Sequence, residues 1–184
     1  EELTKKFSIE RISKAPSVFD VEKLKWINSK YINEMSDEEY YNFVHSFVEE
    51  DLNEFGEDQK KVLLNLYKKQ LAYGAQIKEL IVDFIQPPVL TEESKAFMNE
   101  SGVYNTVKVF KSQLEAMSDW NVENIKEAIN NTKDLAEVKG KMLFMPIRIC
   151  ATHLMHGPDL AETVWLFGKE AVLKNIEKIL NFEN

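Results

Sequence analysis

The stretch KGKMLFMPIRICATHLMHGPDLAETVWLFGKEAVL, from Lys139 to Leu173, carries the clearest helical pattern in the chain. Apolar residues recur at positions 147, 150, 151 and 154, the i, i+3, i+4, i+7 spacing of one buried helical face. We expect Pro146 in the first turn of this helix, where its missing N–H leaves no hydrogen bond unmade. Gly157 and Pro158 are expected to end the helix, and an amphipathic helix is expected after Gly168. The segment therefore predicts helices packed on a common core.

Arg148 stands out in this stretch, because only two of the 23 basic residues are arginine, the other being Arg11. We expect Arg148 on an exposed helix face, next to the hydroxyl group of Thr152. A planar guanidinium with five donors binds a base edge or a phosphate. In the alternative interpretation, Arg148 is a surface arginine whose aliphatic stem covers apolar area. Spacing alone leaves both interpretations open.

The composition is that of a folded α-helical protein. The chain has 184 residues, of which 44% are hydrophobic, so it is long enough for one domain or two small ones. Six glycines and five prolines are few, which favours long helices over a turn-rich β fold. A single cysteine permits no internal disulfide, and there is no apolar run near membrane-spanning length and no signal-like start. We therefore expect a cytoplasmic protein with no membrane partner. The chain starts without methionine, which suggests a piece of a longer protein.

The net charge of −8 argues at first against a nucleic-acid partner. However, the charge is unevenly distributed: residues 1–30 carry +2, residues 31–138 carry −11 and residues 139–184 carry +1. Because surface fields are screened within roughly 8 Å at physiological salt, the two ends of the chain can still present positive surface. The net charge therefore does not exclude RNA.

Helix caps recur along the chain. Asp20 is predicted to cap a helix over 21–35, Ser36 to open a capping box with Glu39, and Thr91 to cap the helix that follows it. The buried face of the first of these helices is predicted to consist of Leu24, Ile27, Tyr31 and Met35. We expect one helix to run through residues 57–71 and a further helix from Gln76 to Ile85. Two later helices are predicted at about 103–117 and 121–138, the second beginning at Ser118 or Asp119.

Gln86-Pro87-Pro88 is the best candidate for a domain boundary, because consecutive prolines cannot lie within a helix. We find no repeat and no convincing alternating strand. The predicted architecture is all-α, with two consecutive helical subdomains at residues 1–86 and 87–184.

Few residues suggest chemistry. Cys150, His153 and His156 have the spacing of a metal triad, but Cys150 lies on the apolar face and no fourth ligand is indicated, so we expect no metal. We expect His153 to be exposed and His156 to close its helix. The sequence has no phosphate-binding glycine loop, no glycine-flanked serine and no isolated carboxylate pair. We therefore expect no catalysis by this chain.

Two stretches resemble one known family. FSIERISKAPSVFDVEKLKWINSKYI, which starts at Phe7, closely resembles the segment that follows the catalytic body of bacterial glutamyl-tRNA synthetases. KGKMLFMPIRICATHLMHGPDLAETVWLFGKEAVL is similar to the C-terminal end of the same enzymes, and residues 36–138 match mainly in length and helical pattern. The resemblance implies an all-helical anticodon-binding region, with the catalytic domain and its ATP and Mg²⁺ sites outside this chain and no cofactor within it.

The resemblance also implies binding residues. In this family the arginine of the Pro-x-Arg element, here Pro146-Ile147-Arg148, contacts the anticodon. The same comparison suggests Thr152 and Leu160, together with the basic residues Lys139, Lys141 and Lys69. The implied partner is tRNA-Glu, with no DNA and with the protein as a monomer. Anticodon bases are unstacked and are read on a small surface, which needs few positive charges.

The resemblance implies that the residue at position 70, here Gln70, helps the enzyme to distinguish tRNA-Glu from tRNA-Gln. Anticodons for glutamate and glutamine differ in their third letter, cytosine or guanine, and family members that reject guanine have an arginine at the matching position. A glutamine amide both donates and accepts, whereas a guanidinium only donates. We therefore expect relaxed discrimination, with glutamate also placed on tRNA-Gln. In the alternative interpretation, Lys68 or Lys69 takes the arginine's role after a shift of one residue.

A second hypothesis from a different class stays open at this point. The acidic centre and the aromatic-rich helices also permit a helical protein-interaction domain that binds no RNA.

Overall fold

The computed structural model describes residues 2–11, 18–86 and 89–181 of the chain. Every regular element in these residues is helical, and no strand occurs among them, which confirms the predicted all-α fold. In chain order the elements are α1 (Glu2–Lys6), η1 (Ile9–Arg11), α2 (Val21–Glu34), α3 (Asp37–His45), α4 (Glu57–Leu66), η2 (Lys68–Gln70), η3 (Gly74–Gln76), α5 (Ile77–Leu80), α6 (Val82–Ile85), α7 (Glu92–Met98), α8 (Val103–Ala116), α9 (Val122–Leu135), α10 (Lys141–Thr152), α11 (Leu160–Phe167) and α12 (Lys169–Asn181), where η marks a 3-10 helix. No helix of the described residues is long and apolar enough to cross a membrane.

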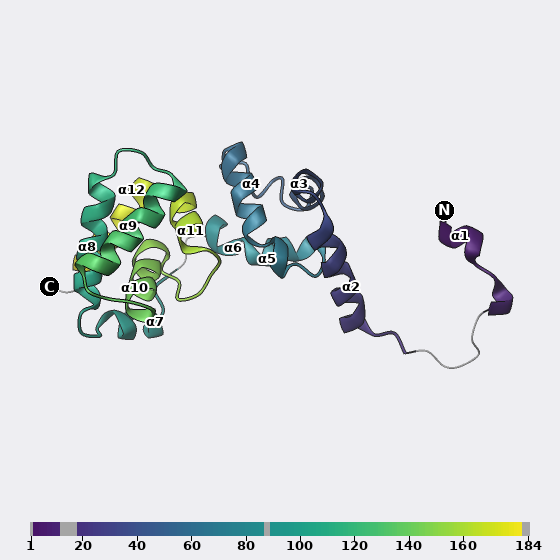
Figure 1. The fold of residues 1–184 in the computed structure, drawn as a ribbon, viewed down its shortest axis with the longest axis horizontal. Helices are drawn as coiled ribbons and strands as arrows, with labels where there is room; N and C mark the ends of the chain where they lie inside the picture. The colour runs from purple at the N-terminus through teal and green to yellow at the C-terminus, as the bar shows by residue number, and fades with distance from the viewer. Residues whose placement is uncertain (1, 12–17, 87–88, 182–184) are drawn as a thin grey trace.

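The buried apolar side chains form two clusters. The first core consists of Ile32, Tyr40, Val44, Val48, Leu52, Leu63, Leu64, Tyr67, Leu71, Ile77, Ile81 and Leu166. The second core is built by α7–α12, from Phe97 to Ile179. Figure 1 shows the corresponding groups, with α7–α12 gathered at one end, α3–α6 beside them and α2 extending away. The predicted boundary residues Pro87 and Pro88 lie outside the described residues, so the boundary itself stays a prediction.

One helix, α11, belongs to both groups. Leu166 is buried in the first core although it lies in the C-terminal part of the chain, and Trp165 packs against both cores. The Trp120 indole Nε1 donates to the backbone oxygen of Trp165 at 3.1 Å, which fixes α11 to the segment before α9. Phe84 and Phe167 add a ring contact with centroids 5.3 Å apart. These contacts hold the two groups of helices together.

The three predicted caps are confirmed. Asp20 accepts a hydrogen bond from the Lys23 N–H, and Thr91 Oγ1 accepts one from the Ser94 N–H. Ser36 forms the predicted reciprocal box, in which its side chain accepts from the Glu39 N–H and the Glu39 carboxylate accepts from the Ser36 N–H. Each cap satisfies backbone donors that the first turn of a helix leaves without partners.

The predicted buried face of α2 was wrong at Leu24 and Tyr31, whereas Ile27 is half-buried and Met35 packs against the first core. Tyr31 is 67% exposed and Leu24 is also exposed, whereas Ile32 is the buried residue of this helix. The reason is that α2 contacts η2 and otherwise extends away from the body of the protein (Figure 1), so most of its apolar residues have no core beside them.

The helices predicted over 57–71 and 76–85 are interrupted. α4 ends at Leu66, and the chain continues through η2, η3, α5 and α6. Gly74 explains part of this path, because a Cβ atom there would lie 2.5 Å from the Phe47 ring and 2.7 Å from the Phe43 ring. The backbone therefore packs directly on two aromatic rings, which only glycine permits. The Gln76 side chain then accepts from the Ala72 N–H at 2.8 Å and stabilises the turn.

α9 also differs from its predicted limits. Its N-cap is Asn121, whose Oδ1 accepts from the Asn124 N–H at 2.8 Å, and not Ser118 or Asp119. It ends at Leu135 because Glu137 adopts a left-handed backbone with φ 55°.

Pro146 lies inside α10, not in its first turn as predicted. A residue without an N–H at this position leaves the carbonyl of Met142 without its helical donor. The buried hydroxyl of Thr106 on α8 lies 3.4 Å from this carbonyl oxygen and 3.3 Å from that of Gly102, so its single hydrogen is shared between the two. A neighbouring helix therefore partly compensates for the bond that proline removes, and α10 continues to Thr152.

The joint role of α11 gives the first prediction. Leu166→Ala removes a side chain that is 4% exposed within the first core, so we expect the free energy of unfolding, measured by urea denaturation, to fall by about 2–5 kcal/mol. Leu135→Ala is the matched control, because Leu135 is 63% exposed and its truncation should change stability by less than about 0.5 kcal/mol. Equal, small effects of the two substitutions would show that α11 does not join the cores.

Candidate functional site

α10 carries Arg148 to the junction of the two helix groups. Arg148 is half-buried, which corrects the predicted exposed position. Its Nη2 donates to the backbone oxygen of Pro158 at 2.7 Å, in the segment that joins α10 to α11. The guanidinium is therefore held against this segment and does not move freely in solvent.

Gly157 leaves the space that the guanidinium fills. A Cβ atom at this position would lie 2.7 Å from Arg148 Nη1, closer than side chains pack. Nη1 itself is buried and has no hydrogen-bond partner in the part of the chain that the structure describes. Arg148 thus uses Nη2 for anchoring and leaves the buried Nη1 without an acceptor among the described residues. A buried donor without an acceptor costs about 1–3 kcal/mol, which a ligand oxygen or ring nitrogen would recover.

The charge environment of Arg148 is set by burial and by two neighbours. Burial lowers the pKa of the guanidinium, while Asp159 and Tyr67 act in the opposite direction. The group stays charged, because the pKa of an arginine starts far above neutral pH. Burial also raises the pKa of Tyr67 to about 12, with a smaller contribution from Asp83. Arg148 therefore reaches from α10 towards the end of α4, where Tyr67 lies.

A hollow of about 620 Å³ lies next to this junction. Four separate segments supply its walls, and the lining residues are Asn33, Asp37, Asn65, Leu66, Lys68, Lys69, Gln70, Pro158, Asp159 and Glu162. Pro158 is the residue that anchors Arg148, so the hollow and the guanidinium share a wall. Lys69 and Gln70 line the hollow, whereas Arg148 is not one of its lining residues and is connected to it through the Pro158 carbonyl.

The basic residues of η2 are not equivalent. The Lys68 ammonium donates to the backbone oxygen of Met35 at 2.7 Å and pairs with Asp37 at 3.1 Å, so it is committed to the fold. Lys69 and Gln70 are exposed and line the hollow. Of the two lysines considered as substitutes for the family's arginine, the geometry favours Lys69.

Thr152 and Leu160 lie below the surface. Thr152 is fully buried, and its hydroxyl donates to the Arg148 carbonyl at 2.8 Å and accepts from the Leu154 N–H at 3.2 Å. Leu160 is buried at the start of α11, which Asp159 caps by accepting from the Glu162 N–H at 3.0 Å. Neither side chain is positioned to touch a ligand directly. Both instead shape the segment that holds Arg148.

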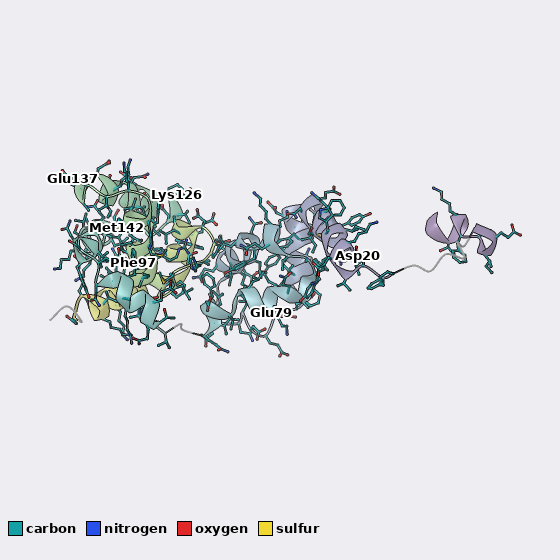
Figure 2. The ribbon with its side chains drawn as sticks, turned by 90° about the horizontal axis from the view of Figure 1, so that it is seen from below. Asp20, Glu79, Phe97, Lys126, Glu137 and Met142 are labelled. Atoms are coloured by element: carbon teal, nitrogen blue, oxygen red, sulfur yellow. The ribbon has the colours of Figure 1, made fainter. Side chains whose placement is uncertain are left out.

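Lys139 and Lys141 lie elsewhere. Both are exposed at the start of α10, the opposite end from the hollow, and Phe97 and Met142 mark this region in Figure 2. The Lys141 ammonium lies 4.6 Å from the centre of the Phe97 ring. The structure thus does not gather these two lysines with Lys69 and Gln70.

The described residues contain no group of three potential metal ligands. Cys150 is buried, its Sγ donates to the Ile147 carbonyl at 3.2 Å, and burial raises the pKa of its thiol above the ordinary range. His153 ends α10 in a left-handed conformation with φ 63° and is half-buried, not exposed as predicted. His156 lies beyond the helix, so it does not have the predicted closing role.

Several wall residues escaped the sequence analysis. Asn33, Asn65, Asp159 and Glu162 come from four positions with no shared motif. Asp159 had one available signal, because an aspartate before an apolar run is a typical N-cap. Glu162 is partly buried, and burial and the nearby Asp159 raise the pKa of its carboxyl. The hollow therefore has carboxylates (Asp37, Asp159 and Glu162) as well as lysines (Lys68 and Lys69) in its walls.

Comparison with known proteins identifies the family of the chain. The family described as "Anticodon binding domain" matches residues 19–180. The chain is 44% identical over 182 residues to the glutamate–tRNA ligase of Mycoplasma capricolum, covering 97% of this chain and 38% of that protein. It is 37% identical over 188 residues to the corresponding ligase of Halalkalibacterium halodurans, covering 98% of this chain and 39% of the relative. The chain thus spans well under half the length of these relatives.

A solved structure shows the same fold. The glutamate tRNA ligase from Elizabethkingia meningosepticum, crystallised in complex with its amino acid, matches with a TM-score of 0.81 at 22% identity. The match covers 98% of this chain and 36% of that one.

The second prediction concerns Gly157. Gly157→Ala places a methyl group where Arg148 Nη1 lies, so we expect the guanidinium to leave the Pro158 carbonyl. Because the chain has only two arginines, Arg148 and Arg11, the side-chain Nε–H signals in an NMR spectrum can be assigned by substitution. We expect the Arg148 signal to shift and to exchange faster with solvent. Gly56→Ala is the control, since a Cβ there meets only Gln59 Oε1 at 3.4 Å. An unchanged Arg148 signal in Gly157→Ala would contradict the claim that the guanidinium needs the space left by Gly157.

Proposed function

Because the chain belongs to the anticodon-binding domain family, we propose that it reads the anticodon of tRNA-Glu as part of a glutamate–tRNA ligase. The observation that carries this proposal is the guanidinium of Arg148. It is half-buried and anchored through Nη2 to the carbonyl of Pro158, a residue that lines a hollow large enough for a nucleotide base, and its Nη1 has no partner among the described residues. A donor held rigidly in a shielded site discriminates between bases, because a wrong base leaves it unpaired.

The acidic net charge is compatible with this proposal. Anticodon bases are splayed out and are recognised by hydrogen bonding and stacking, which need few positive charges. Phosphate contacts in a complete ligase would be made over a larger surface than this chain provides. The single desolvated arginine then contributes specificity, and the affinity comes from elsewhere.

The ligase activity is also a proposal, because the chain spans only 38–39% of the relatives' length. We propose that ATP and Mg²⁺ bind the catalytic part of the complete enzyme and that this chain contributes no reacting group. The complete enzyme would act in the cytoplasm, where transfer RNA is charged, and the chain would work as a monomer.

Gln70 supports a second element of the proposal, relaxed choice between tRNA-Glu and tRNA-Gln. Gln70 is exposed and lines the same hollow as Pro158, whose carbonyl accepts the hydrogen bond from Arg148. Its amide presents both a donor and an acceptor, so it suits either cytosine or guanine after rotation. Lys69, exposed beside it, is the competing candidate for this position.

The protein-interaction alternative is not favoured. A helical docking domain gives no reason for a buried, anchored arginine beside a polar hollow, whereas base recognition does.

The third prediction tests Arg148. In titrations of the chain with an anticodon-arm RNA of tRNA-Glu, Arg148→Ala should weaken binding by about 1–3 kcal/mol. Arg148→Lys should recover little, because an ammonium keeps the charge but lacks the planar fork. The salt dependence separates a base contact from a phosphate contact. If Arg148 contacts a base, the slope of log binding constant against log salt concentration should stay the same in both variants. Loss of a phosphate contact would instead reduce the magnitude of this slope by about 1.

Lys174→Ala is the matched control for Arg148, because Lys174 is an exposed cation on α12 outside the hollow. Urea denaturation of each variant shows whether the fold is retained. An Arg148→Ala chain that is folded and binds the RNA as tightly as the wild type would refute the assigned role.

The fourth prediction tests Gln70 in a complete ligase that carries this chain. We expect the wild type to charge both tRNA-Glu and tRNA-Gln transcripts, and Gln70→Arg to lose tRNA-Gln selectively, because a rigid donor crowds and mispairs guanine. Lys69→Ala is the companion variant, and it should leave the choice unchanged. A wild type that refuses tRNA-Gln, with discrimination lost in Lys69→Ala, would assign the role to Lys69 instead.

A further inference from the structure

Phe144 is an exposed aromatic side chain on a helix that is otherwise well packed. Among the described residues from 92 to 181, the large hydrophobic side chains that are exposed are Leu135 and Phe144. Phe144 is 50% exposed, whereas α10 buries Leu143, Ile147, Ile149, Cys150 and Ala151 in the second core. The ring is therefore not needed to fill that core.

The position of Phe144 on the helix places it between two cations. Lys141, Phe144, Met145 and Arg148 follow the i, i+3, i+4, i+7 spacing, so they share one helical face. Lys141 and Phe144 are exposed on this face, and Met145 and Arg148 are half-buried. With a rise of 1.5 Å per residue, Lys141 and Arg148 are about 10 Å apart along the axis. The aromatic ring lies between them, one turn from Arg148.

The surrounding sequence is free of negative charge. Residues 139–158, which contain this face and the anchor of Arg148, include none of the chain's 31 acidic residues. The same is true of residues 59–78, which supply Lys69 and Gln70 to the hollow. The lining of the hollow does include the carboxylates of Asp37, Asp159 and Glu162, so the stretch without acid is the one that runs along α10. The charge pattern of that stretch complements the phosphates of an RNA strand.

We propose that Phe144 stacks on a base of single-stranded RNA that flanks the base bound at Arg148. This inference rests on the proposed function and adds a binding residue to it. Aromatic side chains interleaved with cations are typical of surfaces that bind single-stranded nucleic acid, because every base offers a face for stacking and every phosphate a charge. An RNA strand leaving the hollow past Pro158 and Arg148 follows α10 to Phe144, and its phosphate then reaches Lys141 and Lys139.

The Lys141 ammonium has a defined place on this path. It lies over the buried ring of Phe97, so the cation is held near the helix start and is not free to swing away. Phe144 and Lys141 are three residues apart, about 4.5 Å along the helix axis, so one extended strand can reach both side chains.

The test is a double-mutant cycle between protein and RNA. The 184-residue chain and the variants Phe144→Ala, Phe144→Leu and Phe144→Tyr are titrated with the anticodon-arm RNA of tRNA-Glu. The same titrations are repeated with RNAs that lack one base, at the loop position before or after the anticodon. We expect Phe144→Ala and Phe144→Leu to weaken binding of the intact RNA by about 10-fold and Phe144→Tyr to bind as the wild type does. Against one of the two base-lacking RNAs, Phe144→Ala should have no further effect, because the stacking partner is already missing.

Leu135→Ala is the matched control, an exposed apolar truncation in the same helix group that should leave RNA binding unchanged. If the wild type binds RNA and Phe144→Ala binds equally well, stacking is overturned while anticodon reading survives. If Phe144→Leu binds as the wild type does, or if the penalty is the same on all three RNAs, the contact is apolar but not with a flanking base, and the proposal is also overturned. If the wild-type chain binds none of the RNAs, the proposed function fails and this inference fails with it.

Discussion

Trp165 and Leu166 pack α11 against both hydrophobic cores, and the position of the candidate site depends on that packing. Leu166 is buried among residues of α2–α5, while the opposite side of α11 contacts α9, α10 and α12. The segment from His153 to Asp159 leads directly into this helix, and its Pro158 and Asp159 line the same hollow as the residues of η2. Without this contact Pro158 and Gln70, which are far apart in the sequence, would have no fixed relation to each other.

The site itself is organised around the removal of one arginine from water. Burial of a guanidinium is costly unless its donors are satisfied, and here one donor is satisfied by the Pro158 carbonyl while Nη1 is not. Gly157 is the residue that permits this arrangement, because any side chain there would displace the guanidinium. Thr152 supports it from below by bonding to the Arg148 carbonyl. The local structure thus keeps a charged donor shielded and oriented before any ligand arrives.

The sequence predicted the local features well and the long-range ones poorly. The caps at Asp20, Ser36 and Thr91 were found because capping depends on residues three apart, which a sequence displays directly. The all-α fold followed from periodicity in the same way. By contrast, Pro146 inside α10 is tolerated partly because Thr106, on a different helix, donates to the carbonyl that proline leaves unpaired. Likewise the path of the backbone after Leu66 depends on Phe43 and Phe47 packing against Gly74. A contact between residues so far apart in the sequence cannot be predicted from a local pattern.

The same distinction applies to the candidate site. Arg148, Lys69 and Gln70 were identified from scarcity and resemblance, but Arg148 was expected on an exposed face. Its burial depends on the positions of Gly157 and Pro158 after folding, which spacing does not encode. The exposed side of α2, with Leu24 and Tyr31, shows the opposite case, in which a correct periodic pattern lacks a core to pack against.

The central claim is that RNA binds where η2 meets the segment between α10 and α11. Hydrogen–deuterium exchange of the chain, measured with and without anticodon-arm RNA, tests it most directly because it maps the contact without any substitution. We predict slower exchange in two separate stretches, residues 66–73 and 141–160, with α12 and residues 21–30 of α2 unchanged. Protection confined to α2 or α12, with neither of the two stretches affected, would contradict the account.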